Sequence, residues 1–249
     1  MNYKIQLFST SNFSNPKPNI LKWQLGGPSW TVALGRRDAT TASQSAANAQ
    51  IPSPFSDLPT LTTFFAAKGL NARDLTVLSG SHTIGQAQCQ FFRGRIFNGT
   101  NIDTNFAESR RSICPSSGGD TNLSPLDSLT PIRFDNNYFS ELVARRGLLI
   151  SDQVLFNGDS QDPLVRTYSD NNAAFFGDFA EAMIKMANIT PLTGTAGEIR
   201  RNCRLVNWTS SVSPFVQYEE RIMEILFCFI AQKLLKIIKL DEFRDSLIF

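Results

Sequence analysis

The sequence of 249 residues contains only four cysteines and one histidine, and its net charge is only +2. The cysteines, at positions 89, 114, 203 and 228, form no C-x-x-C pair, which argues against a zinc site and against thioredoxin-type redox chemistry. The basic residues are dispersed along the chain rather than gathered in a stripe, so we expect no nucleic-acid partner.

Long apolar runs are also missing. The apolar residues 225–231 are too few to span a bilayer. Their helical spacing within residues 208–249 predicts an amphipathic helix, with contact to a membrane surface as the less favoured alternative. Residues 1–25 have neither a helical nor a strand period and no apolar signal-peptide core, so we expect an irregular lead without a secretion signal.

Helical signals dominate the middle of the chain. Capping residues precede, and glycines follow, several stretches that have apolar residues at helical spacing. The expected helices are 58–68, 72–78, a stretch through His82 toward Phe92, 136–146, 160–168 and 172–186. The sequence therefore predicts a mainly α-helical fold with long loops.

Glycosylation sequons are frequent. Five N-x-S/T sequences stand at Asn12, Asn98, Asn122, Asn188 and Asn207. Together with the scattered cysteines they favour a glycoprotein of the secretory pathway. Residues after 25 are typical of a secreted protein, whereas residues 1–25 contain no secretion signal. This mismatch predicts that the chain is truncated at its N-terminus.

The segment around His82 carries the strongest functional indication. Considered alone, a single histidine in a helical stretch is more often a packed or surface residue than a ligand. However, residues 74–89, DLTVLSGSHTIGQAQC, resemble the proximal haem-ligand motif of plant peroxidases. Further segments resemble the same family in the same order: LGRRDATTAS at 34–43, IPSPF at 51–55, LDSLTPIRFDNNYF at 126–139, GLLISDQVLF at 147–156 and RNCR at 201–204.

This resemblance is to class III, the secretory, horseradish-peroxidase-like branch, and it divides the chain into three parts. Residues 26–207 correspond to the proximal part of a plant peroxidase domain. Residues 1–25 and 208–249 form a lead and a tail outside the family. The resemblance thus implies a mainly α-helical, haem-dependent peroxidase fold that is incomplete, with the proximal half present and the distal helices missing.

The resemblance also implies which residues hold the haem. His82 is the expected axial ligand of the iron of haem b, because a haem iron needs an axial protein ligand and a neutral imidazole supplies it. Asp152 is the expected carboxylate that binds the other ring nitrogen and makes the imidazole electron-rich. Considered without the family, Asp152 is better explained as a turn or helix-cap residue.

A single calcium site is implied next to the haem ligand. Its expected ligands are the side chains of Thr83, Asp127, Thr130 and Asp135, with the backbone carbonyl of Arg133 as a weaker addition. Such hard oxygen donors suit Ca²⁺. Ordinary turn and cap chemistry explains each of these residues singly, but not their joint spacing to Thr83.

Other residues match further features of the family. Cys89 and Cys114 correspond to its proximal disulfide, whereas the family partner of Cys203 lies upstream and is absent. Pro52 matches a position whose carbonyl meets aromatic donors at the haem edge. Phe55 and Phe91 are weaker candidates for the same access channel, with simple packing as an equal alternative.

The reaction of the family is the H₂O₂-dependent one-electron oxidation of phenolic donors, in oxidative-stress and cell-wall chemistry. It uses a distal histidine and arginine in a segment ahead of residues 34–43. Here the preceding residues contain neither, so we expect weak haem binding and little or no turnover. The alternatives are a non-catalytic haem- or calcium-binding fragment and a glycosylated interaction protein. The family implies a monomer located in the cell wall or the vacuole.

Overall fold

The computed structural model describes residues 2–5 and 25–207. Helices account for most of the regular structure, which confirms the predicted fold class. The helices are α2 (Gln44–Gln50), α3 (Leu58–Ala66), α4 (Ala72–Ser79), α5 (Cys89–Asn98), α6 (Thr104–Arg111), α7 (Asn137–Val143), α8 (Ile150–Gln153), α9 (Asp162–Asp170) and α10 (Asn172–Ala187), with a 3₁₀ helix η1 (Gly80–Thr83). Among the described residues, no helix is both long and apolar enough to cross a bilayer.

The described residues also form two short antiparallel strand pairs. Strand β1 (Asn2–Ile5) pairs with β2 (Trp30–Ala33), and β3 (Gln86–Gln88) pairs with β4 (Leu123–Pro125). The strand at Asn2–Ile5 differs from the irregular structure that we expected at these four positions, while residues 6–24 of the expected lead lie outside the described residues. Its four residues find hydrogen-bond partners in β2, a contact across the sequence that a local period does not reveal. The predicted amphipathic helix in 208–249 lies outside the described residues.

Local capping explains where several helices begin. The side chain of Asn71 accepts a hydrogen bond from the amide of Asp74, and Asp74 bonds back to the amide of Asn71, which makes a capping box at the start of α4. Asp57 caps α3 and Asn171 caps α10 in the same way, each through one side-chain oxygen. These starts agree with the sequence-based expectation.

The expected continuous helix through His82 toward Phe92 is wrong. After η1, Gly85 adopts a φ of +109°, a conformation that favours glycine, and the chain enters β3 before α5 begins at Cys89. The pairing of β3 with β4 draws the backbone out of the helical path.

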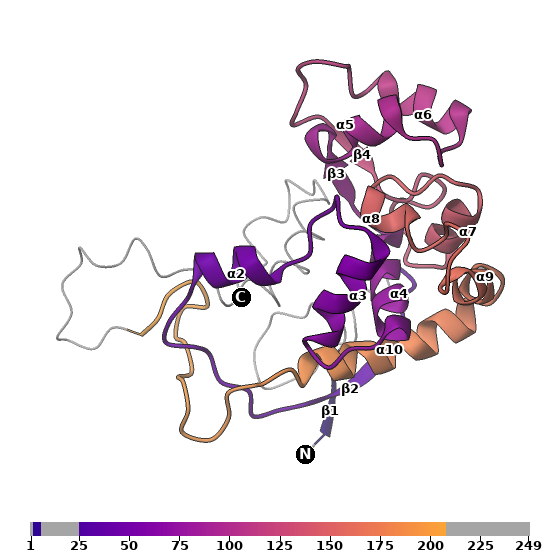
Figure 1. The fold of residues 1–249 in the computed structure, drawn as a ribbon. Helices are drawn as coiled ribbons and strands as arrows, with labels where there is room; N and C mark the ends of the chain where they lie inside the picture. The colour runs from indigo at the N-terminus through magenta and orange to yellow at the C-terminus, as the bar shows by residue number, and fades with distance from the viewer. Residues whose placement is uncertain (1, 6–24, 208–249) are drawn as a thin grey trace.

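The main core lies where α4, α7, α9 and α10 pack together. In Figure 1, α10 crosses the base of α3 and α4, and α7 to α9 lie beside them. Aromatic rings fill this core: Phe139 and Phe175 are 5.0 Å apart between centroids, as are Phe134 and Phe179. The apolar residues that recur at helical spacing in 172–186 face this core: Phe175, Phe179 and Met183 are buried, and Met186 is partly buried against it. A second core, around α5, α6 and the β3–β4 pair, forms the upper part of Figure 1.

Candidate functional site

His82 lies at the junction between α4 and the main core. Helix α4 ends at Ser79, and Gly80 continues the chain into η1, which carries His82. A Cβ atom on Gly80 would lie 2.6 Å from the Phe175 ring and 2.8 Å from the Phe139 ring. Only glycine therefore lets this turn approach the aromatic core so closely, and the turn fixes the backbone of His82.

The imidazole of His82 is paired with Asp152. The distance from His82 Nδ1 to Asp152 Oδ1 is 2.7 Å, although the two residues are 70 positions apart. The His82 side chain is 32% exposed, whereas that of Asp152 is only 2% exposed. Because Nδ1 is engaged, Nε2 is the ring nitrogen left for a further partner, and the partial exposure of the ring gives such a partner access.

Two more donors hold Asp152. The Leu149 amide donates to Oδ2 at 3.0 Å, which is the cap expected of an aspartate at the start of α8. The Tyr138 hydroxyl donates to Oδ1 at 3.1 Å, and the Tyr138 ring stands edge-on to His82. Burial raises the pKa of Tyr138 well above that of an exposed tyrosine, and the charge of Asp152 raises it further. Tyr138 therefore keeps its proton and acts as a donor.

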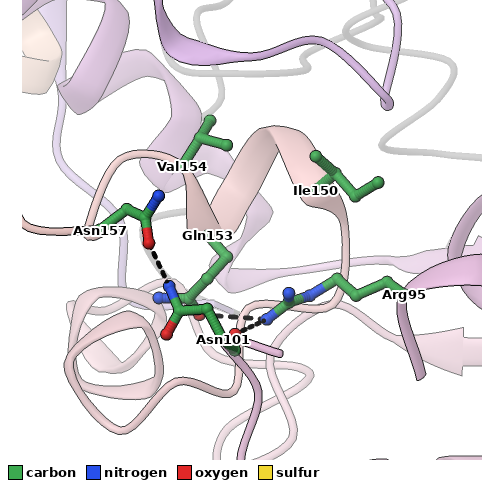
Figure 2. Close-up of a pocket in the computed structure, with 6 residues that line it drawn as sticks. All are labelled: Arg95, Asn101, Ile150, Gln153, Val154 and Asn157. Atoms are coloured by element: carbon green, nitrogen blue, oxygen red, sulfur yellow. Dashed lines mark hydrogen bonds between the residues drawn. The ribbon is translucent and has the colours of Figure 1, made fainter. Parts of the chain in front are cut away.

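A small cavity borders α8, as Figure 2 shows. Its lining residues are Arg95, Asn101, Ile150, Gln153, Val154 and Asn157. Arg95 is buried and donates to the carbonyls of Gly147 and Asn101 at 2.8 and 2.9 Å. Burial lowers the pKa of Arg95, and the charge of Asp152 acts in the opposite direction. With about 80 Å³ the cavity is too small for a macrocycle, and His82 does not line it.

Four oxygen-bearing side chains converge directly beside His82. Thr83 Oγ1 donates to Asp127 Oδ2 at 3.0 Å and lies 3.4 Å from Asp135 Oδ1. Thr130 Oγ1 lies 3.0 Å from Asp135 Oδ1 and 3.3 Å from Asp127 Oδ2. Thr83, Asp127 and Asp135 are buried. The structure thus brings together the four side chains that the resemblance grouped as calcium ligands.

The charge in this cluster is unbalanced. Burial raises the pKa of the Asp127 carboxyl, and the nearby charge of Asp135 adds to the rise. Burial likewise raises the pKa of Glu141, which accepts hydrogen bonds from the amide and hydroxyl of Ser128. The exposed guanidinium of Arg133 lies 3.6 Å from Asp135 Oδ2, so Arg133 contacts the cluster through its side chain. Two buried carboxylates with two hydroxyls fit a hard cation, which would neutralise the excess charge.

No larger set of metal-binding side chains stands out. Within residues 2–5 and 25–207, no group of three or more histidine, cysteine, aspartate or glutamate side chains could hold a metal ion. The cluster at Thr83 has only two carboxylates and depends on hydroxyls for the rest of its oxygen atoms. The expected contribution of the Arg133 carbonyl stays a prediction.

A disulfide joins Cys89, the first residue of α5, to Cys114, just after α6. This confirms the predicted pair. Both cysteines are fully buried in the second core, together with Leu148 and Leu149, which directly precede α8. Cys203 is free and exposed, and Cys228 lies outside the described residues.

The proposed substrate residues lie on the loop before α3 and on α5. Phe55 is 53% exposed, and its ring centroid is 6.4 Å from that of Phe91. Pro52 is partly buried in the same loop. The Ser151 amide donates to the Pro54 carbonyl at 3.1 Å, which ties the loop to the residue next to Asp152. This hydrogen bond therefore holds the loop against the start of α8, where Asp152 lies. The binding of phenolic donors at Pro52, Phe55 and Phe91 stays a prediction.

Sequence reasoning did not single out Tyr138, Arg95 or Glu141. Tyr138 stands within the predicted helix after Asp135, but nothing local indicates that its hydroxyl meets a carboxylate 14 residues later. Arg95 and Glu141 are charged residues of α5 and α7, and both are buried. Only the tertiary fold brings these groups to the site.

Comparison with known proteins finds similarity to peroxidases. A family model described as Peroxidase matches residues 20–171. A peroxidase from Lupinus polyphyllus is 71% identical over 157 residues, which are 63% of this chain and 99% of that protein. Peroxidase 22.3 of Oryza sativa subsp. japonica is 58% identical over 185 residues, covering 74% of this chain and 58% of the rice protein.

A relative with a more specific name is similar as well. The lignin-forming anionic peroxidase of Nicotiana sylvestris is 58% identical over 184 residues, which are 74% of this chain and 57% of that protein. The chain therefore spans less than 60% of the length of the rice and Nicotiana relatives, while it spans nearly all of the lupin one.

Proposed function

The chain belongs to the plant peroxidase family, and on that basis we propose that it binds haem b through His82. The observation that carries this proposal is the 2.7 Å contact between His82 Nδ1 and Asp152 Oδ1 in a chain that has no other histidine. This bond sets the donor role of Nδ1 and leaves Nε2 for the iron. The His82 side chain is 32% exposed, so part of the ring is accessible to a ligand.

Asp152 is the residue that prepares His82 for this role. It is almost fully buried and accepts three hydrogen bonds, so the carboxylate is fixed in orientation. A buried carboxylate bound to Nδ1–H increases the electron density of the imidazole. When bound, haem supplies the redox chemistry that couples H₂O₂ to one-electron oxidation of phenolic donors.

Ca²⁺ is the second proposed cofactor, held by Thr83, Asp127, Thr130 and Asp135. The raised pKa of Asp127 supports it, because two buried carboxylates close together are costly without a cation. Thr83 follows His82 directly in η1. A bound ion would thus stiffen the turn that carries the haem ligand.

We propose little or no peroxide turnover by this chain alone. Cleavage of H₂O₂ needs a base that accepts and returns a proton and a cation that stabilises the leaving oxygen. The only histidine is already assigned to the iron, so the sequence offers no second imidazole for the proton transfer. Pro52, Phe55 and Phe91 are the proposed contact residues for phenolic donors.

The remaining proposals concern the setting of the protein. We propose a secreted monomer, supported by the buried disulfide and by the sequons. Asn98 and Asn188 are exposed and suit glycosylation. Asn122 and Asn207 use their side-chain amides in hydrogen bonds to the carbonyls of Ile113 and Ile199, each at 2.8 Å, which disfavours modification there.

Titration with haemin tests the main proposal. The parent should give the Soret band of a histidine-ligated haem, and His82→Ala should lose it. Cys203→Ser is the matched control, because it removes an exposed free thiol that could also bind iron, and it should behave as the parent does. The absence of a Soret band in the parent would refute haem binding. Guaiacol oxidation with peroxide well above the rate of free haemin would refute the proposed lack of turnover.

A further inference from the structure

One oxygen of Asp152 serves two donors. His82 Nδ1 lies 2.7 Å and the Tyr138 hydroxyl 3.1 Å from the same atom, Oδ1. The other oxygen, Oδ2, is used by the Leu149 amide. Tyr138 and His82 therefore share a single acceptor, and a change in one bond is expected to affect the other.

The core fixes the position of the Tyr138 hydroxyl. Tyr138 is 1% exposed, and its ring packs edge-on against Phe139 at 5.1 Å between centroids. Arg95 also acts on Asp152, but through its charge, since its described hydrogen bonds go to Gly147, Asn101 and Gln153. Tyr138 is thus the one other side chain that donates directly to Asp152 among the bonds of the described residues.

We propose that Tyr138 is a positioning residue that sets how strongly Asp152 polarises His82. A hydrogen bond draws electron density from its acceptor, so the Tyr138 hydroxyl makes Oδ1 a weaker acceptor for His82 Nδ1–H. Without that hydroxyl, Oδ1 would accept a hydrogen bond from His82 alone. The bond to His82 Nδ1–H would be stronger and the imidazole would become more electron-rich. The bond itself is independent of any ligand; only its consequence for the iron rests on the proposed function.

The chain offers a matched pair of substitutions. Tyr138→Phe deletes the shared bond and keeps the ring in the core. Tyr168→Phe deletes another tyrosine–aspartate bond, because the Tyr168 hydroxyl donates to Asp178 Oδ2 at 2.5 Å and the Tyr168 ring is buried in the same core. A general effect of core packing would appear in both variants, and a specific effect only in the first.

The single histidine makes the measurement unambiguous. In the ligand-free chain, the Nδ1 proton of His82 is observed by NMR with nitrogen-15-labelled histidine. We expect this resonance to move downfield in Tyr138→Phe and to stay in place in Tyr168→Phe. An unchanged resonance in Tyr138→Phe, or an equal shift in both variants, would overturn the inference.

Two further measurements keep the test decisive. If Tyr138→Phe fails to fold, 3-fluorotyrosine at position 138 keeps the packing with a stronger donor and should shift the resonance upfield; a downfield shift or none would overturn the inference. With haemin bound, Tyr138→Phe should lower the iron reduction potential relative to the parent and to Tyr168→Phe. Failure of the parent to bind haemin would refute the proposed function, while the NMR result would still decide on the hydrogen bond.

Discussion

Reduction of the Cys89–Cys114 disulfide tests how much the second core depends on this crosslink. The bond closes a loop of 25 residues between the start of α5 and the end of α6. The chain-entropy relation gives about 3.5 kcal/mol for a loop of this length. In a domain of this size each kcal/mol changes the melting temperature by about 2–4 °C, so reduction should lower it by roughly 7–14 °C.

Reduction is a cleaner perturbation than substitution here. Both sulfurs are fully buried, and reduction leaves them in place without opening a cavity. The melting of the chain is followed by circular dichroism, with and without dithiothreitol, in a Cys203→Ser background that removes the exposed thiol. A reduced chain, with its thiols confirmed by mass, that melts within about 2 °C of the oxidised chain would refute the loop argument.

Two other predictions concern the site. When a chelator keeps Ca²⁺ away, the pKa values of the Asp127 and Glu141 carboxyls are raised in the folded chain. The folded chain therefore binds the protons of these two carboxyls more tightly than the unfolded chain does. Their contribution to the free energy of unfolding is therefore full below the unfolded pKa values and is lost as pH rises through the raised folded pKa values. At neutral pH, Ca²⁺ at about 100 times its Kd should raise the free energy of unfolding by about 2.7 kcal/mol, measured by urea unfolding. The Asp127→Asn and Glu141→Gln variants show which part of the pH dependence comes from these two carboxyls. A contribution from them that makes the chelated chain more stable as pH rises from the unfolded to the folded pKa values would contradict the prediction. Gly80→Ala should destabilise the fold by about 1–3 kcal/mol, because the new Cβ meets the rings of Phe175 and Phe139; Gly94→Ala, where a Cβ meets nothing within 4 Å, is the control, and equal unfolding midpoints for the two variants would contradict the clash.

The sequence predicted those elements whose signals are local. Asp57, Asn71 and Asn171 each bond an amide three residues ahead, so the starts of α3, α4 and α10 could be read from short segments. The break after His82 could not, because it depends on β4, more than 30 residues further along the chain. Helices α2 and α6 were missed although Ser43 and Asp103 cap them, since their sequences are polar and show little apolar period.

The site shows why local reasoning and family resemblance gave different explanations for the same residues. Asp152 was expected either as a cap or as the partner of His82, and in the structure Oδ2 binds the Leu149 amide while Oδ1 faces His82. Asp127 divides its oxygens in the same way: Oδ1 accepts the amides of Leu129 and Thr130, and Oδ2 faces Thr83.

In both aspartates, the turn that the carboxylate caps holds the second oxygen in place for a partner far away in sequence. The local turn therefore also orders the site. A carboxylate with one oxygen fixed by backbone amides has already lost its rotational freedom, so the bond of the second oxygen costs less conformational entropy. It follows that replacing Asp152 by alanine should disturb two things at once, the start of α8 and the polarisation of His82, because both contacts of the carboxylate are lost. Replacing Tyr138 by phenylalanine should disturb only the second, which makes these two variants the sharpest means of separating support of the fold from control of the imidazole.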